Sequence, residues 1–268
     1  MRNLLTIAGS DSCGGAGIQA DLKAFSAHGV YGMSVITAVT AQNTQGVFAV
    51  QDINPEIIEA QIDAIFQDIK VHGVKIGMVS QIATIKAIAN KIKQYKPTNV
   101  VVDPVMISKS GYDLLQPEAK VTLIEELIPL ADLITPNLPE AEAITKMTIE
   151  TIEEMKVAAV KIHKMGVKNV LIKGGHLPDR AVDILFDGTE FTFYESKRID
   201  TKNTHGTGCT LSSSIAANLG IGLDIKTALE ASKGYITTAI EHSIDLGKGV
   251  GPTNHFYTLY KNAGMLEE

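Results

Sequence analysis

Cysteine is scarce in this chain of 268 residues, which contains only Cys13 and Cys209. The two are not part of a CxxC pair, so the sequence predicts neither a disulfide framework nor a thiolate zinc site. This usage is typical of the reducing cytosol, and we expect a cytoplasmic protein. Long apolar runs are also lacking: the first residues, MRNLLTIAGSDSCGG, hold a run far shorter than the roughly 20 residues that span a bilayer. We interpret that run as a buried first strand.

Blocks of like charge are lacking too. The formal net charge is −6 and no five like charges are consecutive, so nothing indicates a nucleic-acid or anionic membrane partner. A small-molecule partner is expected instead. The chain has no linker rich in proline or serine, no low-complexity tract and no internal repeat. With 45% hydrophobic residues, it fits a single domain over residues 1–268.

Short runs rich in Val, Ile and Leu alternate with segments of helical period. One such segment, residues 55–69, repeats its apolar residues with the spacing of one helical face. The strands expected are 3–9, 32–39, 73–78, 99–104, 131–136, 169–175 and 181–188. Because they lack polar alternation, they should be buried on both faces of a mostly parallel sheet. The predicted fold class is therefore α/β, a three-layer α/β/α sandwich with its ligand site beyond the carboxyl ends of the strands.

Unusual residues follow the first two predicted strands. In GSDSCGGAGIQADLKAF, glycines such as Gly9 permit close approach of a ligand to the backbone, but a simple turn capped by Asp11 fits equally well. Asp21 would lie inside the following helix, where a solvated surface charge is the simpler interpretation. Gln42 and Asn43 end the second strand, and their amides can read the donor and acceptor pattern of a heteroaromatic ring.

Carboxylates, an amide and a lysine follow the later strands. Asp103, in VVDPVM, could assist a metal site or belong to a turn. Asn137 and Glu140 are three residues apart and would share one helical face, which suits either magnesium or a capping box. Lys173, in LIKGGHL, could face a phosphate or be solvated before a turn.

The stretch KNTHGTGCTLSSSIAANLG, residues 202–220, has the pattern of a loop that enters a helix. Gly206 and Gly208 flank Thr207 and lack the Cβ atoms that would block a phosphate from the N–H groups of the first turn. A thiol in that turn should have a lowered pKa, so Cys209 could accept a proton from the reacting group. A small cysteine packed beneath the helix is the alternative. His205 is interpreted as structural.

In this order the motifs resemble those of the ribokinase-like superfamily, and within it the hydroxymethylpyrimidine and phosphomethylpyrimidine kinases of thiamine biosynthesis. The resemblance rests on TIAGSDSCGGAGIQADLKAF, TAVTAQNTQGV, KIGMVS, DPVMISKSG, TPNLPEAE, KGGHL, KNTHGTGCTLSSSIAANL and GKGVGPTNHF. It implies a ribokinase-like fold with an added strand over 46–53, a homodimer, and the use of ATP and Mg²⁺. The implied reaction is phosphorylation of 4-amino-5-hydroxymethyl-2-methylpyrimidine, and then of its monophosphate to the pyrophosphate.

The resemblance also implies roles for individual residues. Those that would hold the pyrimidine are Gly9, Asp21, Gln42, Met78 and Val105. Asn137 and Glu140 would belong to the magnesium and phosphate network, Lys173 would lie near the nucleotide phosphates, and the anion hole would be Gly206, Thr207, Gly208 and Cys209. Asp103 is added to the expected metal residues from its own position at a strand end. The wider superfamily has an aspartate as catalytic base where this chain has Cys209, a substitution that recurs in the pyrimidine kinases and in some pyridoxal kinases. No chemistry is assigned to Cys13.

Two alternatives remain open from the sequence. A pyridoxal kinase of the same subgroup would phosphorylate a pyridine ring, whose hydrogen-bond pattern differs from the aminopyrimidine edge that Gln42 could pair with. A non-catalytic ligand sensor on the same fold would have no need to keep Asn137, Glu140, Lys173 and a complete anion loop together. Catalysis is therefore the favoured interpretation.

Overall fold

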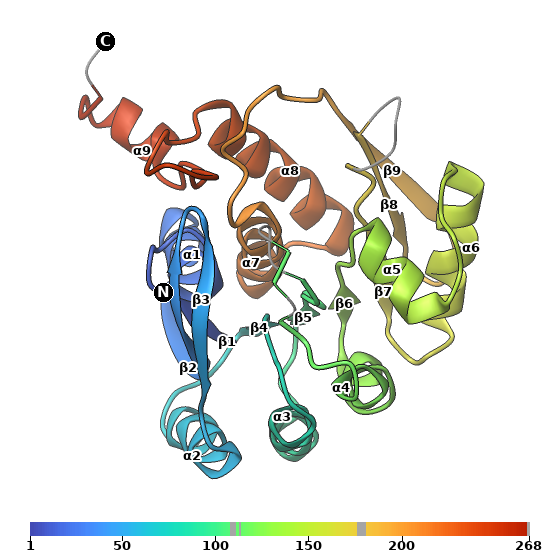
Figure 1. The fold of residues 1–268 in the computed structure, drawn as a ribbon. Helices are drawn as coiled ribbons and strands as arrows, with labels where there is room; N and C mark the ends of the chain where they lie inside the picture. Colours follow the sequence, from blue (N-terminus) through green and yellow to red (C-terminus); the bar gives the residue numbers. More distant parts are fainter. Residues whose placement is uncertain (108–110, 113, 176–180, 267–268) are drawn as a thin grey trace.

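The strands form one mixed sheet within the described part of a computed structural model, residues 1–107, 111–112, 114–175 and 181–266. Their bounds are β1 Asn3–Asp11, β2 Tyr31–Asn43, β3 Gly46–Asp52, β4 Gly73–Ile76, β5 Val100–Val102, β6 Leu133–Ile134, β7 Asn169–Ile172, β8 Ala181–Phe186 and β9 Phe191–Ser196. Across the sheet the order is β3-β2-β1-β4-β5-β6-β7-β8-β9 (Figure 1). The strands from β2 to β7 in that order are parallel, whereas β3 and β8 are antiparallel to their neighbours.

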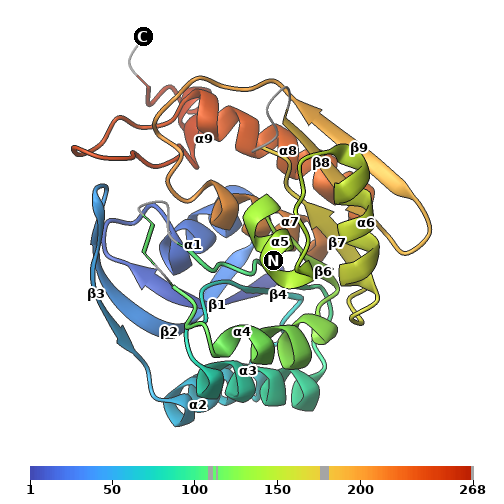
Figure 2. The ribbon, with the colours of Figure 1, turned by 45° about the vertical axis from the view of Figure 1, so that its right-hand side comes forward.

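Helices cover both faces of this sheet. Their bounds are α1 Gly17–Ala27, α2 Pro55–Phe66, α3 Ile82–Tyr95, α4 Ala119–Thr122, α5 Leu138–Thr145, α6 Ile152–His163, α7 Thr207–Gly220, α8 Ile225–Glu241 and α9 Tyr257–Asn262. Helices α2 to α6 bury apolar residues in the core on one face, where α2, α3 and α4 lie in a row in Figure 2. Helices α1, α7 and α8 contribute to a second core on the other face. The predicted three-layer sandwich is confirmed.

All the predicted strands are present, with different ends. Strand β2 continues to Asn43, four residues past the predicted end, and β6 contains only Leu133 and Ile134. Strand β9 was missed because FTFYES is an edge strand with alternating, partly exposed residues and no continuous apolar run. Residues 108–110 of DPVMISKSG and 176–177 of KGGHL lie outside the described residues.

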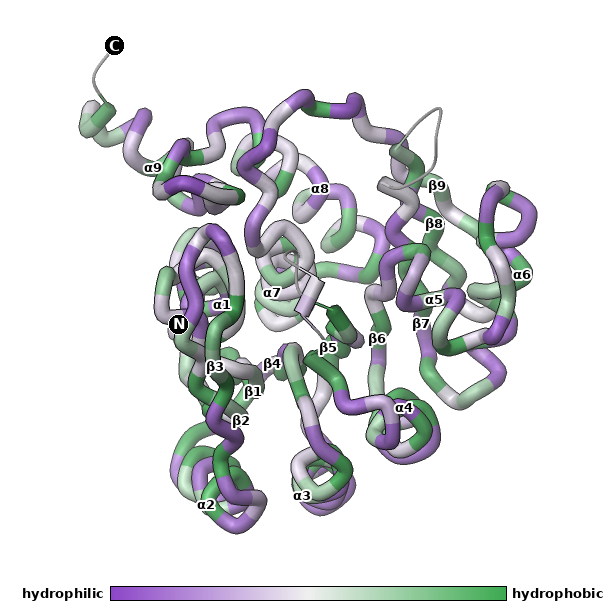
Figure 3. Tube along the Cα trace, in the orientation of Figure 1, coloured by the Kyte–Doolittle hydropathy of each residue, from purple (hydrophilic) through white to green (hydrophobic). Residues whose placement is uncertain are grey.

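The central strands carry the apolar core, as the green of β5 and β6 in Figure 3 shows. Two polar side chains interrupt it, because Thr6 on β1 and Lys75 on β4 are fully buried. A buried charge needs a partner, and that of Lys75 bears on the site below. In the described part of the chain, no helix has both the length and the apolar character needed to cross a membrane.

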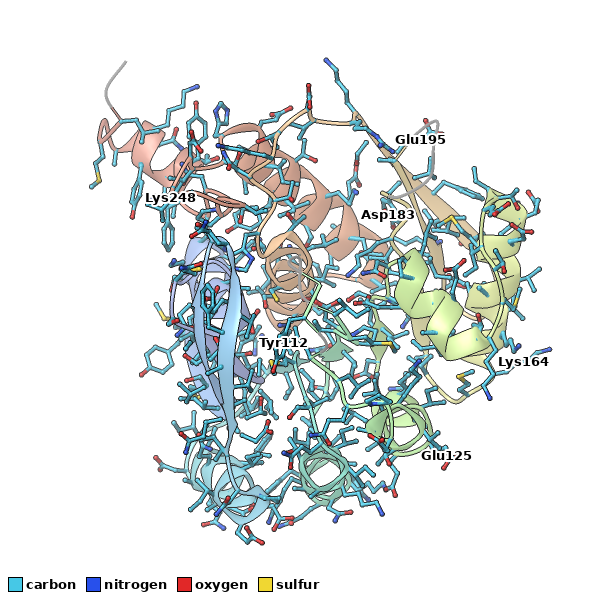
Figure 4. All side chains as sticks on the ribbon, in the orientation of Figure 1. Tyr112, Glu125, Lys164, Asp183, Glu195 and Lys248 are labelled. Atoms are coloured by element: carbon cyan, nitrogen blue, oxygen red, sulfur yellow. The ribbon has the colours of Figure 1, made fainter. Side chains whose placement is uncertain are left out.

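Side-chain caps fix where several helices begin. Asn137 and Glu140 form a capping box at the start of α5, and Thr151 and Glu154 form another at the start of α6. Asp183 of β8, labelled in Figure 4, accepts a hydrogen bond of 2.7 Å from Lys233 of α8 and so joins that helix to the sheet. The capping box that the sequence offered as the alternative for Asn137 and Glu140 is therefore present at the start of α5.

Candidate active site

A cavity of about 650 Å³ lies at the carboxyl ends of the parallel strands. In open α/β sheets this is where ligands bind, because the loops that follow the strands converge there. All the residues predicted for the site line this cavity except Asp21. They are Gly9, Gln42, Met78, Asp103, Val105, Asn137, Glu140, Lys173, Gly206, Thr207, Gly208 and Cys209. Motifs that are far apart in the sequence therefore meet in one site.

Gln42 enters the cavity from the end of β2. Its side-chain oxygen Oε1 accepts a hydrogen bond of 3.1 Å from Thr40 Oγ1, and its Nε2 lies 3.5 Å from His205 Nε2. Two hydrogen bonds with Ser12 fix the backbone of Gln42. The amide is thus held by neighbours on two sides while part of it stays accessible to a ligand.

Close packing around Gly9 shapes the wall of the cavity beside β1. A Cβ atom on Gly9 would lie 2.9 Å from the sulfur of Met78, which follows β4. Glycine at this position therefore lets the buried Met78 side chain lie against β1 as one wall of the cavity.

Asp11 organises the glycine-rich turn after β1. Its carboxylate accepts hydrogen bonds from the N–H groups of Cys13, Gly15 and Ala16, and lies 2.8 Å from His205 Nε2. Burial would raise the pKa of Asp11, but the hydrogen bonds and charge of His205 and the bonds from Cys13 lower it to about 2. The carboxylate therefore stays ionised and holds His205 against the cavity.

Cys13 shares this turn, and its thiol is not set up for reaction. Burial raises the pKa of Cys13 to about 11, and the neighbouring Asp11 adds to the rise. Its sulfur lies close to Asp11 and His205, in a group whose ligand atoms are near enough to hold a metal ion. Three backbone N–H groups already occupy the Asp11 carboxylate, so we interpret the group as a fixed turn.

The first turn of α7 forms one side of the cavity. Gly206 precedes it with a φ of 76°, and a Cβ there would lie 1.7 Å from the carbonyl oxygen of Gly15. Gly206 is therefore required for packing against the turn after β1, which differs from the predicted clearance for phosphate. A Cβ on Gly208 would lie 3.4 Å from Lys173 Nζ and 3.5 Å from Asp103 Oδ2. Gly208 thus leaves the polar space over the first-turn N–H groups open.

The predicted lowering of the Cys209 pKa is wrong. Burial raises the pKa of this thiol to about 11, and the charges of Asp21 and Asp103 add to the rise. The cation of Lys75 and a hydrogen bond from the Gly17 N–H act in the opposite direction without overcoming it. The helix N-terminus was expected to dominate, but desolvation of the thiol outweighs it.

Lys173 and Asp103 form an ion pair on the floor of the cavity. Lys173 Nζ lies 3.0 Å from Asp103 Oδ1, and Thr135 Oγ1 donates to the same oxygen at 3.2 Å. Burial works to lower the pKa of Lys173, but the charges of Asp103 and Glu140 raise it above its ordinary value. The lysine therefore stays cationic at neutral pH, beside Gly208 and the first turn of α7.

Glu140 is the one carboxylate of the predicted metal set without a salt bridge to Lys173 among the described residues. It takes part in the capping box, where the Asn137 N–H donates to Oε2 at 2.8 Å and the Glu140 N–H donates to Asn137 Oδ1 at 2.9 Å. Burial raises the pKa of Glu140 to about 7 against the opposing charge of Lys173. Its environment is thus suited to a nearby cation, which would favour the ionised form.

Asp21 is the predicted site residue that lies outside the cavity. It is fully buried on α1 with both carboxylate oxygens 2.9 Å from Lys75 Nζ. Neither a pyrimidine contact nor a solvated surface charge describes it. Lys75 was missed by the sequence interpretation, although a lysine inside the apolar run GVKIGM is a signal for a buried partner.

Comparisons with known proteins are consistent with this site. The sequence matches the phosphomethylpyrimidine kinase family over residues 11–254. It is 52% identical over 262 residues to a hydroxymethylpyrimidine/phosphomethylpyrimidine kinase of Rhizobium meliloti, covering 96% of this chain and 98% of that protein. A crystal structure of phosphomethylpyrimidine kinase from Clostridium difficile is 56% identical with a TM-score of 0.82, covering 90% of this chain and 100% of that one.

A second solved structure is similar over most of the fold. It is an ADP complex of Bacillus subtilis pyridoxal kinase, 44% identical with a TM-score of 0.90, and the match covers 97% of this chain and 99% of that one. Kinases of two ring substrates thus share this architecture. From the family match and the identity over nearly its whole length, the chain belongs to the phosphomethylpyrimidine kinase family.

Proposed function

We propose that this chain uses ATP to phosphorylate the hydroxymethyl group of 4-amino-5-hydroxymethyl-2-methylpyrimidine, and then phosphorylates the monophosphate to the pyrophosphate. The observation that carries the proposal is one cavity that holds both a fixed amide, Gln42, and the first turn of α7 beside the Lys173 cation. The names of the relatives support the substrate class. A kinase function accounts for a cavity with groups that can bind phosphate, Lys173 and the first turn of α7, better than a ligand sensor does.

In the proposed reaction the hydroxymethyl oxygen attacks the terminal phosphorus of ATP. The bond from that phosphorus to ADP breaks as the new bond forms, and the hydroxyl proton passes to a base. Cys209, as its thiolate, is the proposed base. Because phosphoryl transfer depends chiefly on positioning and electrostatic stabilisation, the N–H groups of Gly208 and Cys209 and the Lys173 cation carry the larger share by holding phosphate oxygens.

Magnesium is proposed to accompany the nucleotide, and the residues present fit it. Mg²⁺ prefers oxygen ligands, keeps several waters and couples to substrate phosphates. Glu140 offers a buried carboxylate that lines the cavity, whereas Asp103 is held by Lys173 and Asn137 Oδ1 is used by the capping box. Glu140 is therefore the proposed metal-organising residue, with Asn137 and Asp103 beside it. The bound ion would supply charge neutralisation at the phosphates.

The role of Glu140 is tested by Glu140→Gln. Glutamine can still accept the Asn137 N–H, so the capping box and the fold should survive. We expect the magnesium concentration at half-maximal rate to rise about tenfold or more, with a smaller change in KM for the pyrimidine, since loss of a hydrogen bond to a charged group costs about 1.5–3 kcal/mol. Glu154→Gln in the matching box of α6 is the control. An unchanged magnesium response would leave Glu140 with its capping role alone.

The proposed substrate is tested by initial rates with ATP, magnesium and each alcohol in turn. Pyridoxal is the alternative substrate, because a pyridoxal kinase is among the similar structures. We expect a higher kcat/KM for the aminopyrimidine than for pyridoxal. A preference for pyridoxal would replace the first proposal with the second, and no phosphorylation of either alcohol would overturn both.

We also propose that the protein is cytoplasmic and that it forms a homodimer. Support for the dimer comes from apolar side chains exposed near one edge of the sheet, such as Tyr31 and Val39 on β2 and Phe48 on β3. Burial of such residues favours self-association. Light scattering should give twice the chain mass of 28.7 kDa. A single-chain mass at micromolar concentration would contradict the dimer.

A further inference from the structure

A buried ion pair lies beneath the site and takes no part in the steps proposed above. Lys75 on β4 and Asp21 on α1 are fully buried, with the lysine Nζ 2.9 Å from both carboxylate oxygens. Buried ion pairs often contribute less stability than apolar residues of the same volume, because desolvation of the charges opposes their attraction. A role other than stability is therefore worth seeking for this pair.

The pair joins the two helices that meet at Cys209. Asp21 accepts hydrogen bonds of 2.6 Å from Thr6 Oγ1 on β1 and from Ser213 Oγ on α7. Ser213 lies one helical turn after Cys209, so the two side chains share a face of α7. Asp21 likewise lies one turn after Gly17, whose N–H donates to the Cys209 thiol. The hydrogen-bonded network therefore lies one turn behind the sulfur on both helices, which pack against each other.

The lysine end of the pair is directed towards the carboxyl end of β4. A Cβ on Gly77, two residues further along, would lie 2.6 Å from Lys75 Nζ, so the ammonium occupies the space that a side chain at Gly77 would take. The next residue, Met78, already lines the cavity. The ammonium is thus held close to the Met78 wall of the cavity.

Four charged groups act on the Cys209 sulfur from the elements around it. They are Lys75 on β4, Asp21 on α1, Asp103 after β5 and Lys173 after β7. Burial raises the pKa of the thiol, the Lys75 cation opposes that rise, and the two aspartates add to it. Lys173 and Asp103 form their own ion pair at 3.0 Å. The balance between Lys75 and Asp21 therefore sets much of the field at the sulfur.

We propose that Lys75 and Asp21 are positioning residues of the kinase reaction: they fix the first turn of α7 against α1 and hold a cation behind Cys209 that favours its thiolate. The inference rests on the proposed function, since the thiolate is the proposed acceptor of the hydroxyl proton. In that step the proton moves from the alcohol to Sγ, the alcohol oxygen bonds to phosphorus, and ADP leaves. Lys75 exchanges no proton and acts through its charge.

Alkylation of Cys209 tests the proposal without any need for kinase activity. In a Cys13→Ser background Cys209 is the only thiol, and its rate of reaction with iodoacetamide at about pH 9 follows its thiolate fraction. Asp21→Asn keeps the cation and removes the opposing carboxylate, whereas Asp21→Asn with Lys75→Met removes both charges. We expect the double variant to react about tenfold more slowly than Asp21→Asn. Equal rates would overturn the proposal.

Two controls separate the charge effect from unfolding. Lys91→Met breaks the ion pair of α3 with Asp63 of α2, away from the site, and should leave the alkylation rate unchanged. If the double variant does not fold, Asp21→Asn alone decides: it should react several-fold faster than the Cys13→Ser parent while keeping its cooperative unfolding. An Asp21→Asn rate equal to or below that of the parent would overturn the proposal. Failure of the kinase assay with wild-type protein would instead overturn the proposed function.

Kinetics provide a second readout once activity is measured. The double variant should have a kcat about tenfold below that of Asp21→Asn, with KM for the pyrimidine within about twofold, because neither residue touches the cavity. A merely structural role would lower only the amount of folded enzyme. That effect disappears when the rates are divided by the active-site concentration. A normalised kcat equal to that of Asp21→Asn would count against the proposal.

Discussion

Gln42 is held in place before a ring enters the cavity. Its Oε1 accepts from Thr40 Oγ1 at 3.1 Å, and its Nε2 faces His205. We predict that Gln42→Ala lowers kcat/KM for the aminopyrimidine by roughly 5- to 150-fold, because a lost buried hydrogen bond costs about 1–3 kcal/mol. Phosphorylation of pyridoxal should fall less, since its ring offers a different pattern of donors and acceptors.

Initial rates on both alcohols measure this selectivity. Gln45→Ala is the control, because Gln45 is an exposed residue of the turn that follows β2 and should leave both rates unchanged. Equal losses on the two rings would remove Gln42 from the specificity argument.

Cys209 has a thiol pKa of about 11 because burial outweighs the Lys75 charge. If the thiolate is the base, kcat/KM should rise with pH towards that value. Cys209→Ala should lower turnover about 100-fold and abolish the alkaline rise, whereas Cys209→Asp should restore part of the rate. The pH profiles of the three proteins are the measurement. An alanine variant with near-normal turnover and an unchanged profile would make Cys209 a packing residue.

At the scale of single elements, the first turn of α7 depends on two glycines for different reasons. Gly206 combines a positive φ with a carbonyl 1.7 Å from its would-be Cβ, whereas Gly208 has ordinary room. We predict that Gly206→Ala lowers the free energy of unfolding by about 1–3 kcal/mol or more. Gly208→Ala should fold normally but lose activity, because its methyl group would enter the space beside Lys173.

Thermal unfolding and kinase rates on the same samples separate the two effects. Gly222→Ala is the control for strain alone, since Gly222 has a φ of 104° and no atom near its would-be Cβ. If Gly206→Ala were no more destabilising than Gly222→Ala, the close approach to Gly15 would have no energetic weight.

Elements with strong periodicity could be predicted from the sequence, although not their exact ends, and so could the polar residues that follow them. The parallel strands are apolar and buried on both faces, so β1, β4 and β7 stand out, and the polar residues just after them converge by geometry. The edge strand β9 lacks that apolar signal. Local sequence patterns were thus sufficient to predict the strands that are continuously apolar and buried.

Charges that depend on tertiary packing could not be predicted. Asp21 has a helical position that suits the surface, and only the fold brings Lys75 and Ser213 to it. The Cys209 pKa likewise depends on desolvation by several elements, which no motif records. Sequence reasoning gave the helix N-terminus too much weight because that effect alone is local.

At the scale of the whole molecule, a buried histidine ties the C-terminal segment to α7. His255 Nε2 lies 3.0 Å from Thr210 Oγ1, and burial lowers the pKa of His255 from 6.5 to about 4 with a contribution from the Lys23 charge. The unfolded chain takes up a proton first, so stability is complete above about pH 6.5 and is lost as pH falls towards 4. We predict a loss of up to about 3 kcal/mol from this residue.

Urea unfolding of wild type and His255→Gln between about pH 7 and about pH 4.5 measures this contribution. The variant should be less stable at neutral pH and should lose less stability on acidification. His28, whose pKa burial also lowers, leaves a smaller dependence of the same sign. The same pH dependence in both proteins would contradict the assignment.

We infer that one cavity transfers phosphate from ATP to the pyrimidine twice. The most direct measurement is phosphorus NMR of the purified chain with ATP, magnesium and 4-amino-5-hydroxymethyl-2-methylpyrimidine, followed over time. We predict that a monophosphate signal appears first and is replaced by a pyrophosphate, with one ADP formed per phosphate transferred, and that Gly208→Ala slows both phases together. ATP hydrolysis without phosphorylated pyrimidine, or a second phase that Gly208→Ala leaves untouched, would contradict the claim.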